Sequence, residues 1–492
     1  MGRWGPLTAV CAGTFMLLVD VNIVTVALPE MAVGLGTSYG ALQWVMDVYA
    51  LVLAAALLAA GGLADLVGRR RVYVAGLAVF TLASLACGVA PASPALIAAR
   101  AVQGAGAAAM FATTVALVNA SYQGRDRGVA FGVWGAVSGA AAGAGPVIGG
   151  LLTAHLGWRW IFLVNLPAGA AAVVLALRVL AESRDPAARR IDVPGVVSFA
   201  AAAATLTYAL TRAGEAGWRS PAVIGTAAAG LLALAVFAAV EAGNPHPLLD
   251  LRLFRGPSFT GIMIASLVLS GAAFSYLPYT SLWLQTVQGQ DAVAAGLVLL
   301  PISGLSFAVS ALAGRFLNGV SPRWTVGAGM LLIGFGTLGQ AVLAAGSGWT
   351  ALVPGLAVTG VGVGLAMPTV TAAAMASVPP ERGGMAAGAV GTVRQLGYAL
   401  GVAVLGSVFR TTMERSLEHR VPDGDAAAHA LTGGRASGVP QAAAHAAFAS
   451  GLNAACATAG VVALAAGVAA LVLIRRPASA PVPATPVAAP VE

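Results

Sequence analysis

The chain has 492 residues, of which 59% are hydrophobic and only 9% are charged, so it lacks the surface charge of a soluble enzyme or a disordered chain. Its formal net charge of +8 rests on 26 basic residues, all arginine, which fall in short clusters between apolar runs. That spacing indicates membrane topology signals and argues against the long basic stripe of a nucleic-acid-binding protein.

Fourteen apolar runs each approach the roughly 20 residues that a helix needs to cross a hydrocarbon core about 30 Å thick. The first six lie near 8–28, 42–62, 72–90, 95–119, 129–152 and 160–180. Two more lie near 193–212 and 220–241, and the last six near 259–281, 292–312, 323–343, 351–376, 385–409 and 452–474. The pattern predicts an all-α integral membrane protein with 14 transmembrane helices.

The order of the runs predicts four regions. Residues 1–180 form an N-terminal half of six helices, 181–245 carry two inserted central helices, and 246–476 form a C-terminal half of six helices. A long polar loop over 410–451 is expected outside the membrane, within the C-terminal half. The tail 477–492 alternates proline and alanine, so we expect it to be extended and disordered.

Arginine placement predicts the orientation. With the N-terminus inside, the inner segments hold 17 of the 26 arginines and the outer segments hold seven. Because inner loops carry the excess of positive charge, both termini are expected in the cytoplasm, with the chain crossing the cytoplasmic membrane many times.

Four ionisable residues lie inside the predicted spans: Asp20, Asp47, Arg100 and Arg394. Each costs at least about 2.5–3.5 kcal/mol to insert at mid-bilayer, which makes it a candidate functional residue. Helix geometry places Asp20, Asp47 and Arg100 in the outer half of the bilayer, where they could share one cavity. Burial favours a neutral carboxyl and a nearby cation favours its ionised form, so such a pair could exchange a proton as solvent access changes. A static ion pair between helices is the alternative.

Glycine spacing marks the fifth predicted helix. Glycines recur every four residues along it, at Gly135, Gly139 and Gly143, and are followed by Gly145, Pro146, Gly149 and Gly150. This spacing puts the glycines on one face, where a second backbone can approach closely, and Pro146 is expected to bend the helix. Ordinary close packing is the alternative reading.

The inner loop after the second predicted helix reads GGLADLVGRRR over 61–71. Two glycines and three arginines there predict a tight turn anchored at the lipid headgroups. Asp65 is the more specific feature, because it can bond across to a neighbouring helix end or to an arginine.

Together these segments resemble the major facilitator superfamily, and within it the fourteen-helix drug–proton antiporters. The similarity runs over essentially the whole chain. It is carried by LVDVNIVTVALP, GGLADLVGRRR, RAVQGAGAA, GAGPVIGG, WRWIFLVNLPAG and RQLGYALG, which begin at residues 18, 61, 100, 143, 158 and 394.

The resemblance implies roles for these residues. Asp20 and Arg100, with Asp47, are candidates for proton coupling. Asp65 would form a conformational latch with Arg127; the candidate latch residues are Gly61, Asp65, Gly68, Arg69, Arg70 and Arg127. The antiporter motif would shape the interface between the halves through Gly139, Gly143, Gly145, Pro146, Gly149 and Gly150.

The sequence departs from the family pattern at three places. Leu66 stands where an arginine is usual, which would weaken the latch, and Asn22 and Thr25 are exchanged in the first helix. The corresponding loop of the second half, GRFLNGVSPR over 314–323, has Asn318 where an acidic residue is common. We therefore expect no matching latch in that half.

These features predict export of small hydrophobic or amphipathic drugs, coupled to protons and energised by the proton gradient. The protein is expected to act as a monomer. The alternative is a family member that exports or imports another small metabolite. A membrane enzyme and a sensor that does not transport are less favoured, and the spacing of the cysteines and histidines predicts no metal site and no bound cofactor. Weak candidates for the substrate path are Asn22, Trp44, Gln103, Tyr276, Gln285, Arg394 and Gln395.

Overall fold

The computed structural model describes residues 3–37, 39–184, 192–244, 247, 249–316, 320–378, 383–418, 420–421, 423–424, 427–428, 431 and 439–475. All regular secondary structure within these ranges is helical. Twelve helical stretches among them are long and apolar enough to cross a membrane. The chain is therefore an all-α, multi-pass membrane protein. The predicted disordered tail, 477–492, lies outside the described residues.

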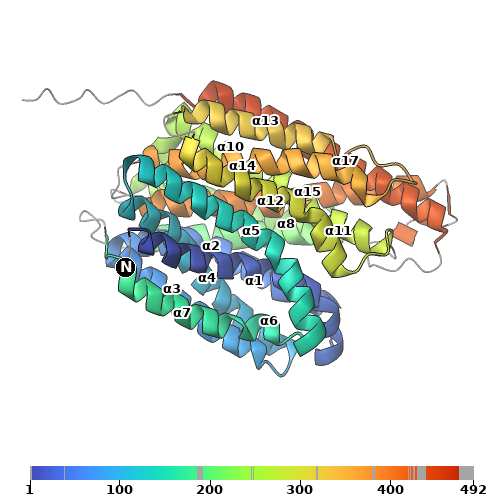
Figure 1. Cartoon of the computed structure of the whole chain (residues 1–492), viewed down its shortest axis with the longest axis horizontal. Coiled ribbons are helices and arrows are strands. Elements are labelled where there is room, and N and C mark those ends of the chain that lie inside the picture. The colour runs from blue at the N-terminus through green and yellow to red at the C-terminus, as the bar shows by residue number, and fades with distance from the viewer. Residues whose placement is uncertain are drawn as a thin grey trace, which may run out of the picture.

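The first half of the chain forms one helical bundle, drawn in blue to blue-green in Figure 1. In this bundle α3 packs against α4, α2 against α4, and α1 against α5. Its elements are α1 (Gly5–Leu35), α2 (Tyr39–Val67), α3 (Arg69–Gly88), α4 (Ser93–Ser121), α5 (Gly124–Leu156), α6 (Trp160–Leu163) and α7 (Asn165–Val179).

Two further helices, α8 (Val193–Ala216) and α9 (Pro221–Gly243), follow as an antiparallel pair. α8 packs against α2 of the first half and against α15 (Gly383–Glu418) of the second, so it contacts both bundles. The rings of Trp44 and Tyr208 stack across the α2–α8 contact with centroids 5.6 Å apart.

The second half forms the other bundle, drawn in yellow-green to red in Figure 1. Here α13 packs against α14 and α17, α12 against α14, and α10 against α15. Its elements are η1 (Leu251–Arg255), α10 (Pro257–Ala273), α11 (Leu277–Thr286), α12 (Ala292–Phe316), α13 (Pro322–Leu338), η2 (Trp349–Leu352), α14 (Val353–Ala376), α15 and α17 (Gln441–Leu473).

Each of the 14 predicted apolar runs is largely helical in the structure, although α5 and α13 are not among the twelve stretches counted above. Three boundaries differ from the prediction. The ninth run is divided, because Pro278 near the start of α11 has no N–H for a helical bond to residue 274. The polar loop expected over 410–451 is shorter, because α15 continues to Glu418 and α17 already begins at Gln441.

The third difference concerns the loop expected over 61–71. α2 runs to Val67 and α3 starts at Arg69, so a single residue, Gly68, separates the two helices. Its φ of 124° lies in a region that side chains other than glycine's rarely adopt. The two glycines and the aspartate predicted in a turn therefore lie on the last turns of α2.

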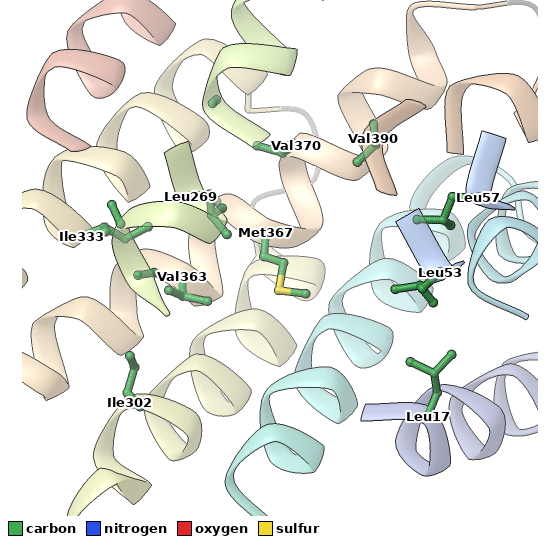
Figure 2. Close-up of a cluster of buried hydrophobic side chains, with 14 of the residues drawn as sticks. Leu17, Leu53, Leu57, Leu269, Ile302, Ile333, Val363, Met367, Val370 and Val390 are labelled. Carbon is green, nitrogen blue, oxygen red and sulfur yellow. The ribbon is translucent and has the colours of Figure 1, made fainter. Parts of the chain in front are cut away.

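The two bundles meet along α5 and α12 and along α2 and α15. A buried apolar cluster continues across this boundary. Figure 2 shows Leu17, Leu53 and Leu57 of the first half on one side, and Ile302, Val363 and Met367 of the second half on the other. The side chains of this cluster are apolar, and apolar contacts are not directional as hydrogen bonds are.

Candidate functional site

The side chain of Asp20 lies in α1 at the centre of the first bundle and is only 1% exposed. Its Oδ2 accepts a hydrogen bond from Nη1 of Arg100 at 2.7 Å. Its Oδ1 accepts from Nε2 of Gln103 at 3.0 Å and from Nδ2 of Asn165 at 2.8 Å. Since Arg100 and Gln103 come from α4 and Asn165 from α7, the carboxylate joins three helices.

Arg100 is as buried as its partner, at 1% exposure. Its Nε donates to the carbonyl oxygen of Val45 in α2 at 3.1 Å, and its Nη1 also donates to Oε1 of Gln103 at 2.7 Å. The guanidinium lies 4.1 Å from the centroid of the Tyr49 ring and 5.9 Å from that of Phe162. A carboxylate, two neutral acceptors and two aromatic rings thus compensate for the loss of water around this cation.

Ser84 closes the network from α3. Its Oγ accepts from Nε2 of Gln103 at 2.7 Å and from Nδ2 of Asn165 at 3.3 Å, and it donates to the carbonyl oxygen of Phe80 at 2.9 Å. Asp20 accepts three hydrogen bonds, from Arg100, Gln103 and Asn165, at a carboxylate that has about four acceptor sites. The carboxylate therefore helps to hold α1 against α4 and α7.

The structure brings Asp20 and Arg100 into direct contact, as their shared depth predicts. Asp47 is half-buried in α2, between the two α2 residues that contact Arg100, and its part in proton coupling stays a prediction. Gln103 was expected on the substrate path. It is fully buried and bonded to both members of the ion pair, and its place on the substrate path stays a prediction.

Sequence reasoning did not select Asn165, Ser84 or Tyr49 for this site. All three are uncharged, so the cost of a charge in the membrane did not single them out. A usable signal existed for Asn165, which is a polar residue within an apolar run and lies in the family-like segment WRWIFLVNLPAG.

A second charged site lies at the junction of α2 and α3, where Asp65 is buried. Its Oδ1 accepts from Nε and Nη2 of Arg69 at 3.0 and 2.8 Å. Its Oδ2 accepts from the backbone N–H of Met385, in the first turn of α15, at 3.1 Å. One carboxylate therefore links the two halves, and it does so at a helix N-terminus, where negative charge is favoured.

The segment after α7 reinforces this junction. The Glu182 carboxylate accepts from the backbone N–H groups of Arg70 and Arg71 at 3.1 and 3.3 Å, which caps the start of α3. Nη2 of Arg70 donates to the carbonyl oxygen of Leu177 at 2.6 Å. A Cβ added at Gly68 would lie 2.6 Å from Glu182, so only glycine fits there.

The expected pairing of Asp65 with Arg127 is not what the structure shows. Nε of Arg127 donates to the carbonyl oxygen of Tyr122 at 3.1 Å. Tyr122 directly follows α4, so this bond stays within the first half. The bond of Asp65 to the other half is made by the backbone N–H of Met385, and its role as a latch stays a prediction. Gly61 lies buried in α2, one turn before Asp65, while Asn318 lies outside the described residues.

The glycines of α5 divide between two neighbours. Gly135 and Gly139 face Ser310 and Ser306 of α12, across the boundary between halves, and Gly150 faces Val293 of the same helix. Gly145 and Gly149 were expected at that boundary too. They pack instead on α1 within the first half, against Asn22 and Ile23, because the face of a helix turns by about 100° with each residue. Gly143 and Pro146 lie in α5, and the bend at Pro146 stays a prediction.

The other candidate path residues are scattered. Tyr276 is fully buried and accepts from Nε2 of Gln340 at 3.0 Å, so it is not on an accessible surface. Nε2 of Gln285 donates to Ser281 at 3.0 Å, and Nδ2 of Asn22 donates to the carbonyl oxygen of Leu18 at 2.7 Å. Trp44 stacks on Tyr208. Only Arg394 and Gln395, both half-buried in α15, are adjacent to one another.

Comparison with known proteins finds relatives over most of the chain. It is 37% identical over 430 residues to the multidrug resistance protein Stp of Mycobacterium tuberculosis, covering 86% of this chain and 80% of that protein. It is 34% identical over 411 residues to the methylenomycin A resistance protein of Streptomyces coelicolor, covering 83% of this chain and 86% of that protein.

The fold also matches a solved structure. The human organic anion transporter MFSD10 (TETRAN) superposes with a TM-score of 0.65 at 15% identity, covering 96% of this chain and 100% of that chain. At this identity the match shows the fold alone. Residues 10–402 match the family described as the Major Facilitator Superfamily. With most of its length matched to that family and to close relatives, the chain belongs to the Major Facilitator Superfamily.

Proposed function

We propose that this chain exports small hydrophobic or amphipathic drugs and antibiotics in exchange for protons, by alternating access between its two halves. The observation that carries the proposal is the fully buried Asp20–Arg100 pair, whose carboxylate holds three helices together through donors alone. The names of the two relatives, a multidrug resistance protein and an antibiotic resistance protein, support drugs as the cargo.

We place the chain in the fourteen-helix branch of drug–proton antiporters. The support is that α5 and α13 are helical across the fifth and eleventh predicted spans, which with the twelve apolar stretches makes fourteen. The excess of arginine on inner segments supports both termini in the cytoplasm and a place in the cell membrane. We propose that it acts as a monomer on solutes, not as an enzyme, with the proton gradient in place of any cofactor.

The proton step follows from the hydrogen bonds of Asp20. When the carboxylate takes a proton from outside, its charge no longer offsets that of Arg100, and the hydrogen bonds it accepts from its three donors become weaker. Either change loosens α1 from α4 or α7, so the protonated and ionised states favour different helix packings. The conformation that binds drug and the conformation that releases the proton inside are then coupled through this one group.

The Asp65 contact supplies the second element that alternating access needs. It holds the start of α15 against the end of α2, so the two halves are in contact at this end of the molecule. Opening that end for drug entry requires the Met385 N–H to leave Asp65. Because Arg69 stays on the same side as Asp65, the carboxylate keeps a partner when the halves part, which lowers the cost of opening.

A resistance panel followed by proton flux tests the proposal. Expression in a susceptible host identifies exported compounds, and each is then added to proteoliposomes that hold a pH-sensitive dye. We expect each exported drug to drive proton movement, and no such movement in protein-free liposomes. If no compound moved protons, antiport would be ruled out; a response only to nutrients would favour metabolite transport.

A further inference from the structure

The guanidinium of Arg394 is the starting point, because it is a half-buried cation that makes no ion pair within the described part of the chain. Its Nη2 contacts the sulfur of Met367 at 3.8 Å. Its Cζ lies 5.9 Å from the centroid of the Phe111 ring. Its Nε is buried and has no hydrogen-bond acceptor.

The other interior arginines are compensated differently. Arg100 and Arg69 each donate to a carboxylate at 2.8 Å or less, and neither needs a further anion. A thioether sulfur and an aromatic ring at the outer limit of cation–π distance are both weak partners for a guanidinium. Partial removal of a cation from water without a counter-charge is costly, so an acceptor supplied by a bound molecule would stabilise Arg394.

Arg394 also lies where alternating access would expose it. Its two contacts come from opposite halves, Phe111 from α4 and Met367 from α14. One turn earlier on α15, a Cβ added at Gly391 would lie 3.2 Å from the Phe111 ring and 3.3 Å from Leu57 of α2. Figure 2 shows Met367 reaching from the second half toward the leucines of the first. The two side chains known to contact the guanidinium are thus apolar, and they come from both halves.

We propose that Arg394 is the anion-binding group of the substrate site, and that amphipathic organic acids are the substrate class of this transporter. The free Nε and the weakly held Nη2 offer the two parallel donors that a carboxylate accepts from an arginine. Phe111, Met367 and Leu57 offer the apolar surface for the rest of the molecule. This inference rests on the proposed function and assigns its cargo.

The test uses three probes with one fluorophore: 1-pyrenebutyric acid, its methyl ester, and the matching pyrenebutyl trimethylammonium cation. Each is titrated against purified full-length protein in nanodiscs, with empty nanodiscs subtracted. We expect the acid to bind about tenfold or more tighter than the ester, the difference made by one charged hydrogen-bonding group. Arg394→Gln should bring the acid to the level of the ester, Arg394→Lys should keep part of the preference, and Arg159→Gln, an exposed cation, should change nothing.

Three results would overturn the inference. They are equal binding of acid and ester by the wild type, an equal loss of both in Arg394→Gln, and tightest binding of the cationic probe. Because binding is measured without transport, its outcome is separate from that of the proton-flux experiment. Proton-coupled export of neutral drugs with no acid preference would leave the proposed function intact and remove this inference alone.

Discussion

The α3–α4 pair of the first half and the α13–α14 pair of the second make the same close contact between backbones. A Cβ added at Gly76 would lie 2.9 Å from the carbonyl oxygen of Gly106, and one added at Gly329 would lie 2.8 Å from that of Gly362. These glycines are therefore a common reference from which positions in the two halves can be compared.

When positions are counted in residues from these glycines, the two halves differ at the position of the buried cation. Arg100 precedes Gly106 by six residues, and Leu356 precedes Gly362 by six. Both side chains are buried, at 1% and 0% exposure. A leucine thus occupies in the second half the position that a cation occupies in the first.

The partner position differs in the same way. In the first half, Gly145 of α5 packs against the carbonyl oxygen of Val19 in α1, the residue directly before Asp20. In the second half, Gly397 of α15 packs in the same way against the carbonyl oxygen of Leu267 in α10, the residue directly before Val268. The second half therefore has valine and leucine where the first has the ion pair.

A neutral polar cluster remains in the second half. Nε2 of Gln340 donates to the hydroxyl oxygens of Tyr276 and Thr359 at 3.0 and 3.3 Å. The same helix arrangement is thus stable with neutral side chains alone. The difference teaches that packing does not require the Asp20–Arg100 charges. Burying these two charges costs free energy, so we take them to be present for another reason, which is coupling to protons.

The largest effect is expected from Asp20→Asn, which removes the charge and keeps the shape. Asparagine can still accept from one amide donor, so the protein should insert and fold, while drug-driven proton movement should fall to the level of empty liposomes. Asp291→Asn is the matched control, because this exposed carboxylate only caps the start of α12. Drug-dependent proton movement that survived in Asp20→Asn would show that Asp20 is not the carrier.

A double replacement tests the comparison directly. Arg100→Leu alone leaves a buried carboxylate without its cation and should cost about 3–5 kcal/mol of stability. Asp20→Val with Arg100→Leu converts the site to the pattern of the second half and should recover most of that loss without restoring proton flux. Unfolding midpoints in detergent measure the first quantity and dye-loaded proteoliposomes the second. A double variant no more stable than Arg100→Leu would contradict the equivalence of the two halves.

The Asp65 latch has an intermediate expected effect. Asp65→Asn weakens the bond to the Met385 N–H and loses the charge that holds Arg69, so the closed end should open more often, by about 1–3 kcal/mol of coupling energy. A Leu58→Cys reporter, buried between α2 and α15 in a background without the three native cysteines, should then react faster with an impermeant maleimide. An unchanged rate would mean that other contacts hold this end closed.

These comparisons also show what could be predicted from the sequence. The presence and approximate positions of the helices could, because about 20 apolar residues are a physical requirement that each span must meet on its own. The Asp20–Arg100 pair could, because a charge in an apolar run needs a partner at the same depth. The partner of Asp65 could not: it is a backbone N–H 320 residues away, which carries no side-chain signal and depends on how the halves dock. The roles of Asn165 and Ser84 depend likewise on the packing of α7 and α3.

The smallest effects should come from one chemical change made in both clusters. Gln340→Met removes a neutral donor whose own Oε1 has no partner in the described structure, so it should cost about 1 kcal/mol and leave proton flux unchanged. Gln103→Met removes a donor to Asp20 and an acceptor for Arg100, and should reduce proton flux as well as stability. Both quantities are measured as for the double replacement. Equal losses of flux in the two variants would mean that the neutral cluster also takes part in coupling, and the distinction between the halves would fall.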